Sequence, residues 1–476
     1  MENKTALNVI YNNIFIISGV LFPVLTFPYV TRVLGPEYLG VVNLAISIST
    51  IFVMLMQVGV PIYGIKAMSK TYDPEEKRTI FWSLISINII AGCISSFFYG
   101  VFVVYSGYLS AEPLLYAMII PSLLLGFTSV DWFFASNEDF KSIAIRTLIL
   151  RAISVICLFV FVRDKNDYTA YAAIIIYGGL ASNAILFFIA CQKLGLRHVK
   201  IKFINIKNHV SPLKYLLFAS IISALYGSFD ILVLEHFWGA EFVGYYTIDR
   251  RLTLIIIALV GSFSMVLIPK MTRQISTGDS AGFQSIFSKS MVFLYALNLP
   301  VMSVLFVYSE EIIVCFAGDS FLNSVTALKI LSLQVLFNSM SNLLNIQILM
   351  PLNKEKDIFN SSMVGLLVNI VIGLLLIPGY NIVGAAVALI TSECVVFLLR
   401  IRVVLKSVNL SLNNECIFIS LLSFGMFLCL FISKSITSGE DFYHKVVYAS
   451  FTVLVVSLLY AFSVYKKWIK VYSRKH

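Results

Sequence analysis

The chain has 476 residues, of which 59% are hydrophobic and 13% charged, and its mean hydropathy is +0.89. Soluble domains carry about 25% charged residues, so this composition excludes a soluble globular protein and indicates a polytopic membrane protein. The net charge of +10 would also suit a nucleic-acid-binding protein, but the basic residues lie mostly in short loops between apolar runs, a pattern that membrane topology explains.

The seven cysteines are scattered, mostly within apolar runs, and none belongs to a CxxC pair. This distribution is typical of small core residues. We therefore expect no metal site, no required disulfide and no cofactor.

Apolar runs of about 20 residues predict an all-α integral membrane protein with fourteen transmembrane helices. The first run follows a short polar N-terminus and continues past any signal-peptide cleavage point, so it is interpreted as a span. The predicted spans cover residues 9–33, 39–64, 79–105, 112–134, 143–162, 168–192, 212–237, 242–267, 285–308, 322–350, 359–378, 381–404, 415–434 and 445–465.

Basic residues alternate between the two sides of these spans. One set of loops and tails holds about 24 Lys and Arg residues, and the other holds about 5. Because basic loops stay in the cytoplasm, both termini are predicted to be cytoplasmic. This orientation requires an even number of spans, which fourteen satisfies.

A short motif recurs at the same topological position in two halves of the chain. Residues 35–40, GPEYLG, precede the second span, and residues 239–244, GAEFVG, precede the eighth, about 204 residues and six spans later. A weaker echo at 379–384, GYNIVG, precedes the twelfth span. We interpret the motif as a structural corner shared by two halves of equal orientation.

The repeat predicts two six-helix lobes in a pseudo-two-fold arrangement, followed by two extra helices. The predicted divisions are an N-terminal lobe at 1–193, a basic cytoplasmic linker at 194–211, a C-terminal lobe at 212–406, and a final part at 407–476 with two spans and a basic tail. The linker is interpreted as a solvated segment at anionic headgroups, and a docking surface for a cytoplasmic enzyme is the alternative.

Three segments resemble those of a known family. They are PYVTRVLGPEYLGVVNLA at 28–45, FDILVLEHFWGAEFVGYYTIDRRL at 229–252 and FAGDSFLNSVTALKIL at 316–331. With these segments and its span count, the chain resembles the polysaccharide transporters, or Wzx-type O-antigen flippases. Their superfamily also includes the multidrug and toxic compound extruders and the lipid II flippases.

The resemblance implies two lobes around a central cavity that opens alternately to either side of a bacterial cytoplasmic (inner) membrane. It implies that an undecaprenyl-pyrophosphate-linked oligosaccharide moves from the cytoplasmic to the outer leaflet, for O-antigen or capsular polysaccharide, with no covalent chemistry. The implied partners are this lipid-linked oligosaccharide, membrane lipids and a complex of polysaccharide polymerase and chain-length regulator. We expect the protein to act as a monomer.

A pyrophosphate that crosses the bilayer needs cations along its path, because each buried charge costs at least about 2.5 to 3.5 kcal/mol. Arg250 and Arg251 lie about nine residues into the eighth span, about 14 Å deep. Arg151 is similarly placed in the fifth span. The planar fork of Arg engages phosphate oxygens, so these three residues are predicted to form a cationic floor.

Two further cations are candidates for the substrate path, and Arg250 and Arg251 have an alternative, structural role. Arg146 and Lys329 are shallower candidates for the substrate path, and either could extend to the membrane interface instead. Arg250 and Arg251 could also pair with Asp249 and Asp230 and simply hold two helices together.

Three buried acids are candidates for ion coupling: Asp230 in the seventh span, Asp249 in the eighth and Glu393 in the twelfth. An acid inside a span can carry a proton, which would suit exchange of protons for the substrate, and a structural ion pair is the alternative.

Aromatic side chains could contact the sugars, although most will serve helix packing. Tyr226, Tyr245 and Tyr246 lie close to the charged stretch and are the candidates for sugar contact.

Other functions are weighed against this one. A drug exporter of the same fold would favour acids at the midplane, whereas a lipid II flippase would need the same cations. A glycosyltransferase or O-antigen polymerase would need a sizeable outer loop, and no predicted outer loop exceeds roughly 15 residues. The absence of a GxxxxGK[ST] motif argues against ATP-driven transport.

The charges are not repeated between the halves. At the repeat offset, Asp249, Arg250 and Arg251 correspond to Ala45, Ile46 and Ser47, and Asp230 corresponds to Thr26. We therefore expect substrate-recognising charge to lie mainly in the C-terminal lobe, with Arg151 as the main contribution of the other lobe.

Overall fold

The apolar runs form helices because a backbone surrounded by lipid must satisfy its own hydrogen bonds. The computed structural model describes residues 2–195, 206–277, 280–407, 414–437 and 442–473, and all regular structure within them is helical. The predicted all-α fold is thereby confirmed. Most of the predicted linker lies outside these ranges.

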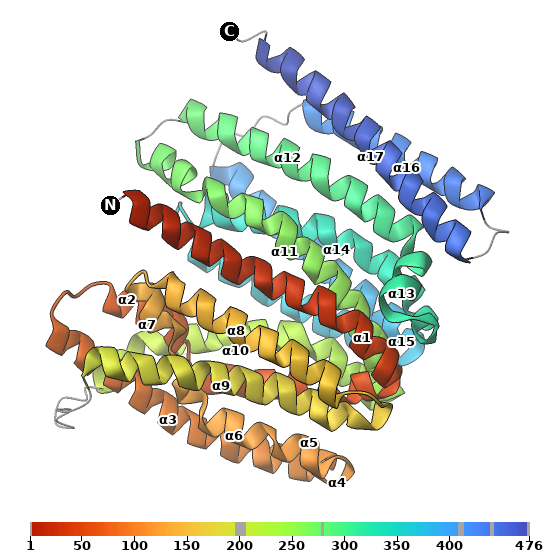
Figure 1. The fold of residues 1–476 in the computed structure, drawn as a ribbon. Helices are drawn as coiled ribbons and strands as arrows, with labels where there is room; N and C mark the ends of the chain where they lie inside the picture. Colours follow the sequence, from red (N-terminus) through yellow and green to blue (C-terminus); the bar gives the residue numbers. More distant parts are fainter. Residues whose placement is uncertain (1, 196–205, 278–279, 408–413, 438–441, 474–476) are drawn as a thin grey trace. The chain divides into compact units, whose positions relative to one another are not determined.

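Contacts divide the chain into two units, Met1–Glu235 and His236–His476. The first unit contains ten α-helices and two 3₁₀ turns among the described residues (Figure 1), and the last of these helices extends three residues past its boundary. Their bounds are α1 (Glu2–Gln57), α2 (Val60–Met68), α3 (Pro74–Tyr105), α4 (Tyr108–Ala111), α5 (Pro113–Ala117), α6 (Ile119–Leu124), η1 (Gly126–Thr128), α7 (Asp131–Ser136), α8 (Phe140–Phe161), η2 (Lys165–Asp167), α9 (Tyr168–Leu194) and α10 (Ile206–Trp238).

The second unit has seven α-helices within the part of it that is described. These and its two short turns are α11 (Ala240–Thr277), α12 (Ser280–Val307), α13 (Ser309–Ala317), the 3₁₀ turn η5 (Asp319–Ser324), α14 (Val325–Leu344), the π-helical turn η6 (Asn345–Leu349), α15 (Glu355–Ser407), α16 (Asn414–Ile436) and α17 (Phe442–Ser473). The predicted domain divisions, which put the seventh span in the second lobe, stay a prediction.

Ten described helical segments are long and apolar enough to cross a bilayer, or eleven with the bent pair Pro113–Leu124 and Gly126–Ser136. Two of them, Leu21–Met68 and Glu355–Ser407, have 48 and 53 residues. At about 1.5 Å per residue each measures about 70 to 80 Å, more than twice the hydrocarbon core of about 30 Å. The protein is a multi-pass membrane protein, and fourteen as the number of spans stays a prediction.

Both long segments are interrupted inside the helix. Gly35 within α1 has φ 70° and ψ 178°, and Asn381 within α15 has φ 45° and ψ −132°. Gly239, which separates α10 from α11, has φ 83°. All three breaks fall in the repeated motif, so the motif coincides with interruptions between long helices.

A hydrophobic cluster fixes one end of the first unit. Phe81 of α3 contacts the rings of Trp132 and Phe133 of α7, and Leu186 of α9 belongs to the same cluster. It holds together the start of α3, the turn from α7 to α8 and the end of α9.

Candidate functional site

Asp249 lies on α11, in the second unit, and is completely buried. The Ser324 hydroxyl at the end of η5 faces its carboxylate, but neither carboxylate oxygen accepts a hydrogen bond of regular geometry from the described residues. Among the described residues, no side-chain nitrogen of a basic residue lies within 4.0 Å of the Asp249 carboxylate oxygens. A buried carboxylate without a countercharge is costly, so this site favours a neutral carboxyl group or a bound cation.

Polar groups continue along the contact between α11 and α14. The Thr253 hydroxyl lies 3.1 Å from Oε1 of Gln334, and both side chains are buried. Nearer the start of α11, Nδ2 of Asn323 lies 3.3 Å from the Tyr245 hydroxyl, which donates to Glu241 at 2.6 Å. Asp249 therefore lies in the buried part of a polar seam inside the second unit, which reaches the exposed Asn323 and Glu241.

Arg250 and Arg251 follow Asp249 on α11 and are half-buried. The Arg250 guanidinium carbon lies 5.9 Å from the centre of the Tyr246 ring. Successive residues point about 100° apart on a helix, so the two arginines leave α11 in directions different from that of the buried Asp249. Pairing of the two arginines with Asp249 and Asp230 stays the alternative to a substrate-binding role.

In the first unit, Arg151 of α8 contacts the first half of α1. Its Nη1 donates to the Ser18 hydroxyl and, at 3.3 Å, to the Phe15 carbonyl, and its guanidinium carbon lies 5.8 Å from the Phe15 ring. A Cβ added at Gly19 would lie 3.5 Å from Nη2, so the guanidinium also lies against this part of α1 at ordinary contact distance. All these contacts are neutral, and Arg151 has no carboxylate within 4.0 Å among the described residues.

Arg146, one turn earlier on α8, is bound differently. It is 8% exposed, donates to Asp131 at 2.8 Å and donates to the Ser182 carbonyl of α9 at 2.9 Å. These contacts join α7, α8 and α9. This ion pair was not predicted from the sequence, although Asp131 lies near the end of the predicted span 112–134 and Arg146 lies near the start of the next one, 143–162.

The other predicted polar residues are dispersed. Glu393 of α15 accepts a hydrogen bond at 3.1 Å from Asn338 of α14, and Asn342 donates to Asn338 at 2.9 Å. Lys329 of α14 is half-buried and has no ion pair in the described residues, and Asp230 of α10 is 1% exposed.

The tyrosines predicted to contact sugars are mostly packed inside. Tyr245 is 3% exposed, Tyr246 is fully buried and Tyr226 is half-buried. The centre of the Tyr245 ring lies 5.9 Å from that of Phe321 in η5, and sugar contact stays a prediction for all three tyrosines.

Sequence reasoning missed one buried cation. Arg400 of α15 falls inside the predicted span 381–404 but was not among the predicted site residues; it is 8% exposed and donates hydrogen bonds to the hydroxyls of Ser341, Ser361 and Ser362 at 2.8 to 3.2 Å. The paired serines at 361 and 362, on the same helix, are the signal that could have indicated its burial.

Residues 6–275 match the model of the family described as Polysaccharide biosynthesis protein, which is more than half of the chain. The chain belongs to this family. The resemblance to the polysaccharide transporters is thereby confirmed. Residues 216–375 of this family member also match the MatE model.

Named relatives agree with the family. A protein of Escherichia coli strain K12 called "Putative O-antigen transporter" is 22% identical over 397 residues, which cover 83% of this chain and 95% of that protein. Its namesake from Shigella dysenteriae is 20% identical over 403 residues, covering 82% and 98%. "Probable low-salt glycan biosynthesis flippase Agl15" of Haloferax volcanii is 24% identical over 217 residues, 46% of each chain.

Solved structures show the same fold. The lipid II flippase MurJ in an inward closed conformation superposes with a TM-score of 0.75 at 18% identity, covering 98% of this chain and 100% of that one. A point mutant of the Vibrio cholerae MATE transporter VcmN gives a TM-score of 0.56 at 15% identity, covering 88% and 100%. The family member therefore has the fold of membrane flippases and exporters.

Proposed function

We propose that this family member is a flippase for an undecaprenyl-pyrophosphate-linked oligosaccharide. It moves the lipid from the cytoplasmic to the outer leaflet of a bacterial inner membrane by alternating access, in exchange for protons and with no covalent chemistry. The observation that carries the proposal is the pair Arg250 and Arg251, two adjacent cations about nine residues into a predicted span.

The chemistry of the substrate fits these cations. A pyrophosphate carries its charges on oxygens that Arg engages bidentately, and Arg stays protonated at any relevant pH. Arg151 adds a guanidinium in the first unit with only neutral neighbours among the contacts described above. The O-antigen and glycan names of the relatives support an oligosaccharide headgroup for this chain.

The buried Asp249 supports proton exchange. Its carboxyl group is enclosed by α11 and η5 and faces the Ser324 hydroxyl. A proton bound there makes the group neutral, and loss of the proton leaves a charge that the seam must rearrange to solvate. That difference links proton occupancy to the packing of α11 against η5.

An exporter of organic cations is the second candidate, because the MatE model matches residues 216–375 and a buried acid could bind a cation. The two arginines oppose it, since like charge repels such a substrate.

The test replaces both arginines. Charge-assisted hydrogen bonds contribute about 1.5 to 3 kcal/mol each, so Arg250→Ala with Arg251→Ala should lower surface polysaccharide at least tenfold in cells that depend on this gene. Membrane insertion should be unchanged. Arg163→Ala, in an exposed predicted outer loop, is the control and should give normal output. Normal polysaccharide from the double variant would refute the proposal, and lost resistance to a cationic drug on gene deletion would favour the exporter.

A further inference from the structure

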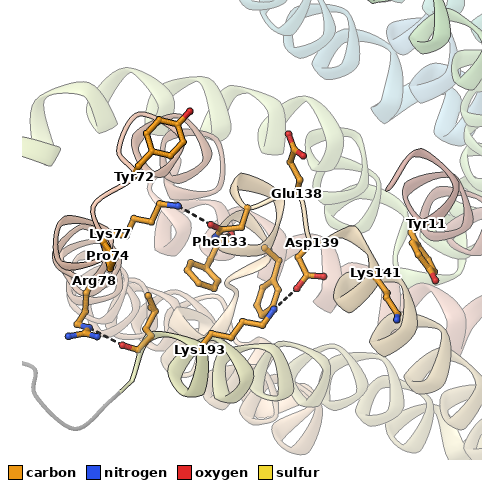
Figure 2. Close-up of a pocket in the computed structure, with 13 residues that line it drawn as sticks. Tyr11, Tyr72, Pro74, Lys77, Arg78, Phe133, Glu138, Asp139, Lys141 and Lys193 are labelled. Carbon is orange, nitrogen blue, oxygen red and sulfur yellow. Dashed lines mark hydrogen bonds and ion pairs between the residues drawn. The ribbon is translucent and has the colours of Figure 1, made fainter. Parts of the chain in front are cut away.

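A pocket of about 670 Å³ opens at one end of the first unit (Figure 2). It lies at the start of α3, the turn between α7 and α8 and the end of α9. Counting crossings along the chain, these three points share one side of the membrane, and their loops belong to the predicted basic, cytoplasmic set. The pocket is therefore placed where the headgroups of the cytoplasmic leaflet lie.

Four cations line this pocket against two acids: Lys77, Arg78, Lys141 and Lys193 against Glu138 and Asp139. Only Lys193 is in an ion pair within the described residues, with Asp139. Lys77 donates to the amide oxygen of Asn137 at 3.1 Å, and Arg78 donates through Nε to the Leu194 carbonyl at 2.9 Å. In the same described ranges, no carboxylate lies within 4.0 Å of Lys77, Arg78 or Lys141.

Two helix caps hold the basic residues of the pocket in place. Asp73 and Asp139 accept hydrogen bonds from the backbones of Glu75 and Ser142, so they cap α3 and α8 and fix the first turns that carry the cations. Burial disfavours the charge of Asp139, but hydrogen bonds from Lys193 and Ser142 outweigh it and hold its pKa below the ordinary value. This cap is therefore present at neutral pH and is lost only as pH falls through that lowered pKa.

The pocket is larger than one phosphate requires, and its rim is aromatic. Figure 2 shows Tyr72 and Tyr11 at opposite ends of the cavity, and Tyr72 is 93% exposed. Lys193 also lies 5.0 Å from the centre of the Phe134 ring, inside the pocket. Pockets of about 300 to 1,000 Å³ take ligands larger than a phosphate group, and tyrosine rings can cover the apolar faces of sugars.

We propose that this basic pocket binds the diphosphate and first sugars of a lipid-linked oligosaccharide in the cytoplasmic leaflet, before translocation. It is a loading site separate from Arg250 and Arg251, and it deepens the function proposed above, on which it rests. An anionic phospholipid offers the same phosphate chemistry, but it has no sugar for the tyrosine rim and would not need this volume.

The experiment measures equilibrium binding to the full chain in phosphatidylcholine nanodiscs. The probe is a radiolabelled undecaprenyl-diphosphate disaccharide, and the protein carries Arg250→Ala and Arg251→Ala so that the cations on α11 cannot bind it. Adding Lys77→Gln and Lys141→Gln should raise the Kd at least tenfold. Gln at 77 can still bond Asn137, and Lys141 is exposed without a partner in the described residues, so folding should be retained.

The matched control removes two cations from the opposite end of the same unit. Arg163→Gln with Lys165→Gln, both exposed, should leave the Kd within twofold. Lys141→Glu alone is a second test and should weaken binding more than Lys141→Gln. A Kd unchanged by the Lys77 and Lys141 variants would overturn the loading site, and so would equal competition by phosphatidylglycerol. Inorganic pyrophosphate should compete more weakly than the disaccharide lipid.

Failure of the loading site is distinguishable from failure of the flippase proposal. If the wild-type chain translocates the lipid while the Lys77 and Lys141 variants bind normally, only the loading site is wrong. If the pocket binds the lipid but the wild-type chain does not translocate it, the loading site stands and the proposed function falls.

Discussion

Asp249 is the residue whose burial constrains the mechanism most. Its carboxyl group is fully enclosed, and no described cation lies within 4.0 Å of it, so its charge state must be linked to the packing of α11 against η5. Neutral and charged forms of such a group differ by several kcal/mol of solvation free energy.

Asp249→Asn imitates the protonated carboxyl group. We expect normal folding and an unchanged thermal midpoint, together with transport that no longer responds to a proton gradient in vesicles. Glu241→Gln is the control, since Glu241 is an exposed acid on the same helix. Transport by the Asn variant that still accelerates several-fold with the gradient would exclude Asp249 as the coupling residue.

Arg146 and Asp131 form an ion pair between α8 and α7, and a place for Arg146 on the substrate path stays a prediction. The Arg146 side chain is 7% exposed and the Asp131 side chain 43%, so solvent screens the pair. A double-mutant cycle with Arg146→Gln and Asp131→Asn should give a coupling free energy of about 1 kcal/mol in chemical unfolding. Additive effects of the two substitutions would show that the pair contributes nothing to stability.

At the scale of elements, the repeated motif marks places where long apolar helices break. Gly35 occupies a region of φ and ψ that is essentially restricted to glycine, and nothing lies within 4 Å of a Cβ added there. Gly239 resembles Gly35, because it also has a positive φ and nothing lies within 4 Å of a Cβ added to it. Glycine is needed at these two corners for its backbone conformation, which is why a sequence motif could identify them.

The third copy of the motif, at residues 379–384, differs from the other two in ways that the sequence did not predict. Gly379 has no positive φ, and the break lies two residues later at Asn381. Gly384 serves another purpose, because a Cβ there would lie 2.6 Å from the backbone of Leu376. Trp238 of the second corner also donates to the Ile377 carbonyl at 2.8 Å. These contacts depend on tertiary packing, which the motif does not encode.

Substitutions at the corners test this assignment. Gly35→Ala and Gly239→Ala should each destabilise the protein by about 1 to 3 kcal/mol, because alanine disfavours that backbone conformation. Gly379→Ala is the matched control and should be close to neutral. Thermal unfolding in detergent measures the difference, and equal shifts for all three variants would contradict the assignment.

For the candidate site, the sequence predicts charged residues but not their partners. Spacing predicts that Arg151, Arg250 and Arg251 lie deep in spans, whereas the contact of Arg151 with α1 and the hydrogen bonds of Arg400 to three serines join segments far apart in the chain. Hydropathy fixes how deep a residue lies, and side-chain packing decides which groups face each other.

At the scale of the whole molecule, we propose that this chain alone moves a diphosphate-linked oligosaccharide across a bilayer. Family membership and a fold shared with flippases and exporters support transport, and the arginines support an anionic headgroup. We propose that the basic pocket binds the lipid in the cytoplasmic leaflet ahead of that crossing.

The most direct test reconstitutes the purified chain in proteoliposomes with a labelled undecaprenyl-pyrophosphate oligosaccharide. Translocation is followed as the label becomes accessible to a membrane-impermeant reagent. We predict rapid crossing with the wild-type chain and at least a tenfold lower rate with Arg250→Ala and Arg251→Ala. A wild-type rate no greater than that of protein-free vesicles, or an equal rate in the double variant, would contradict the account.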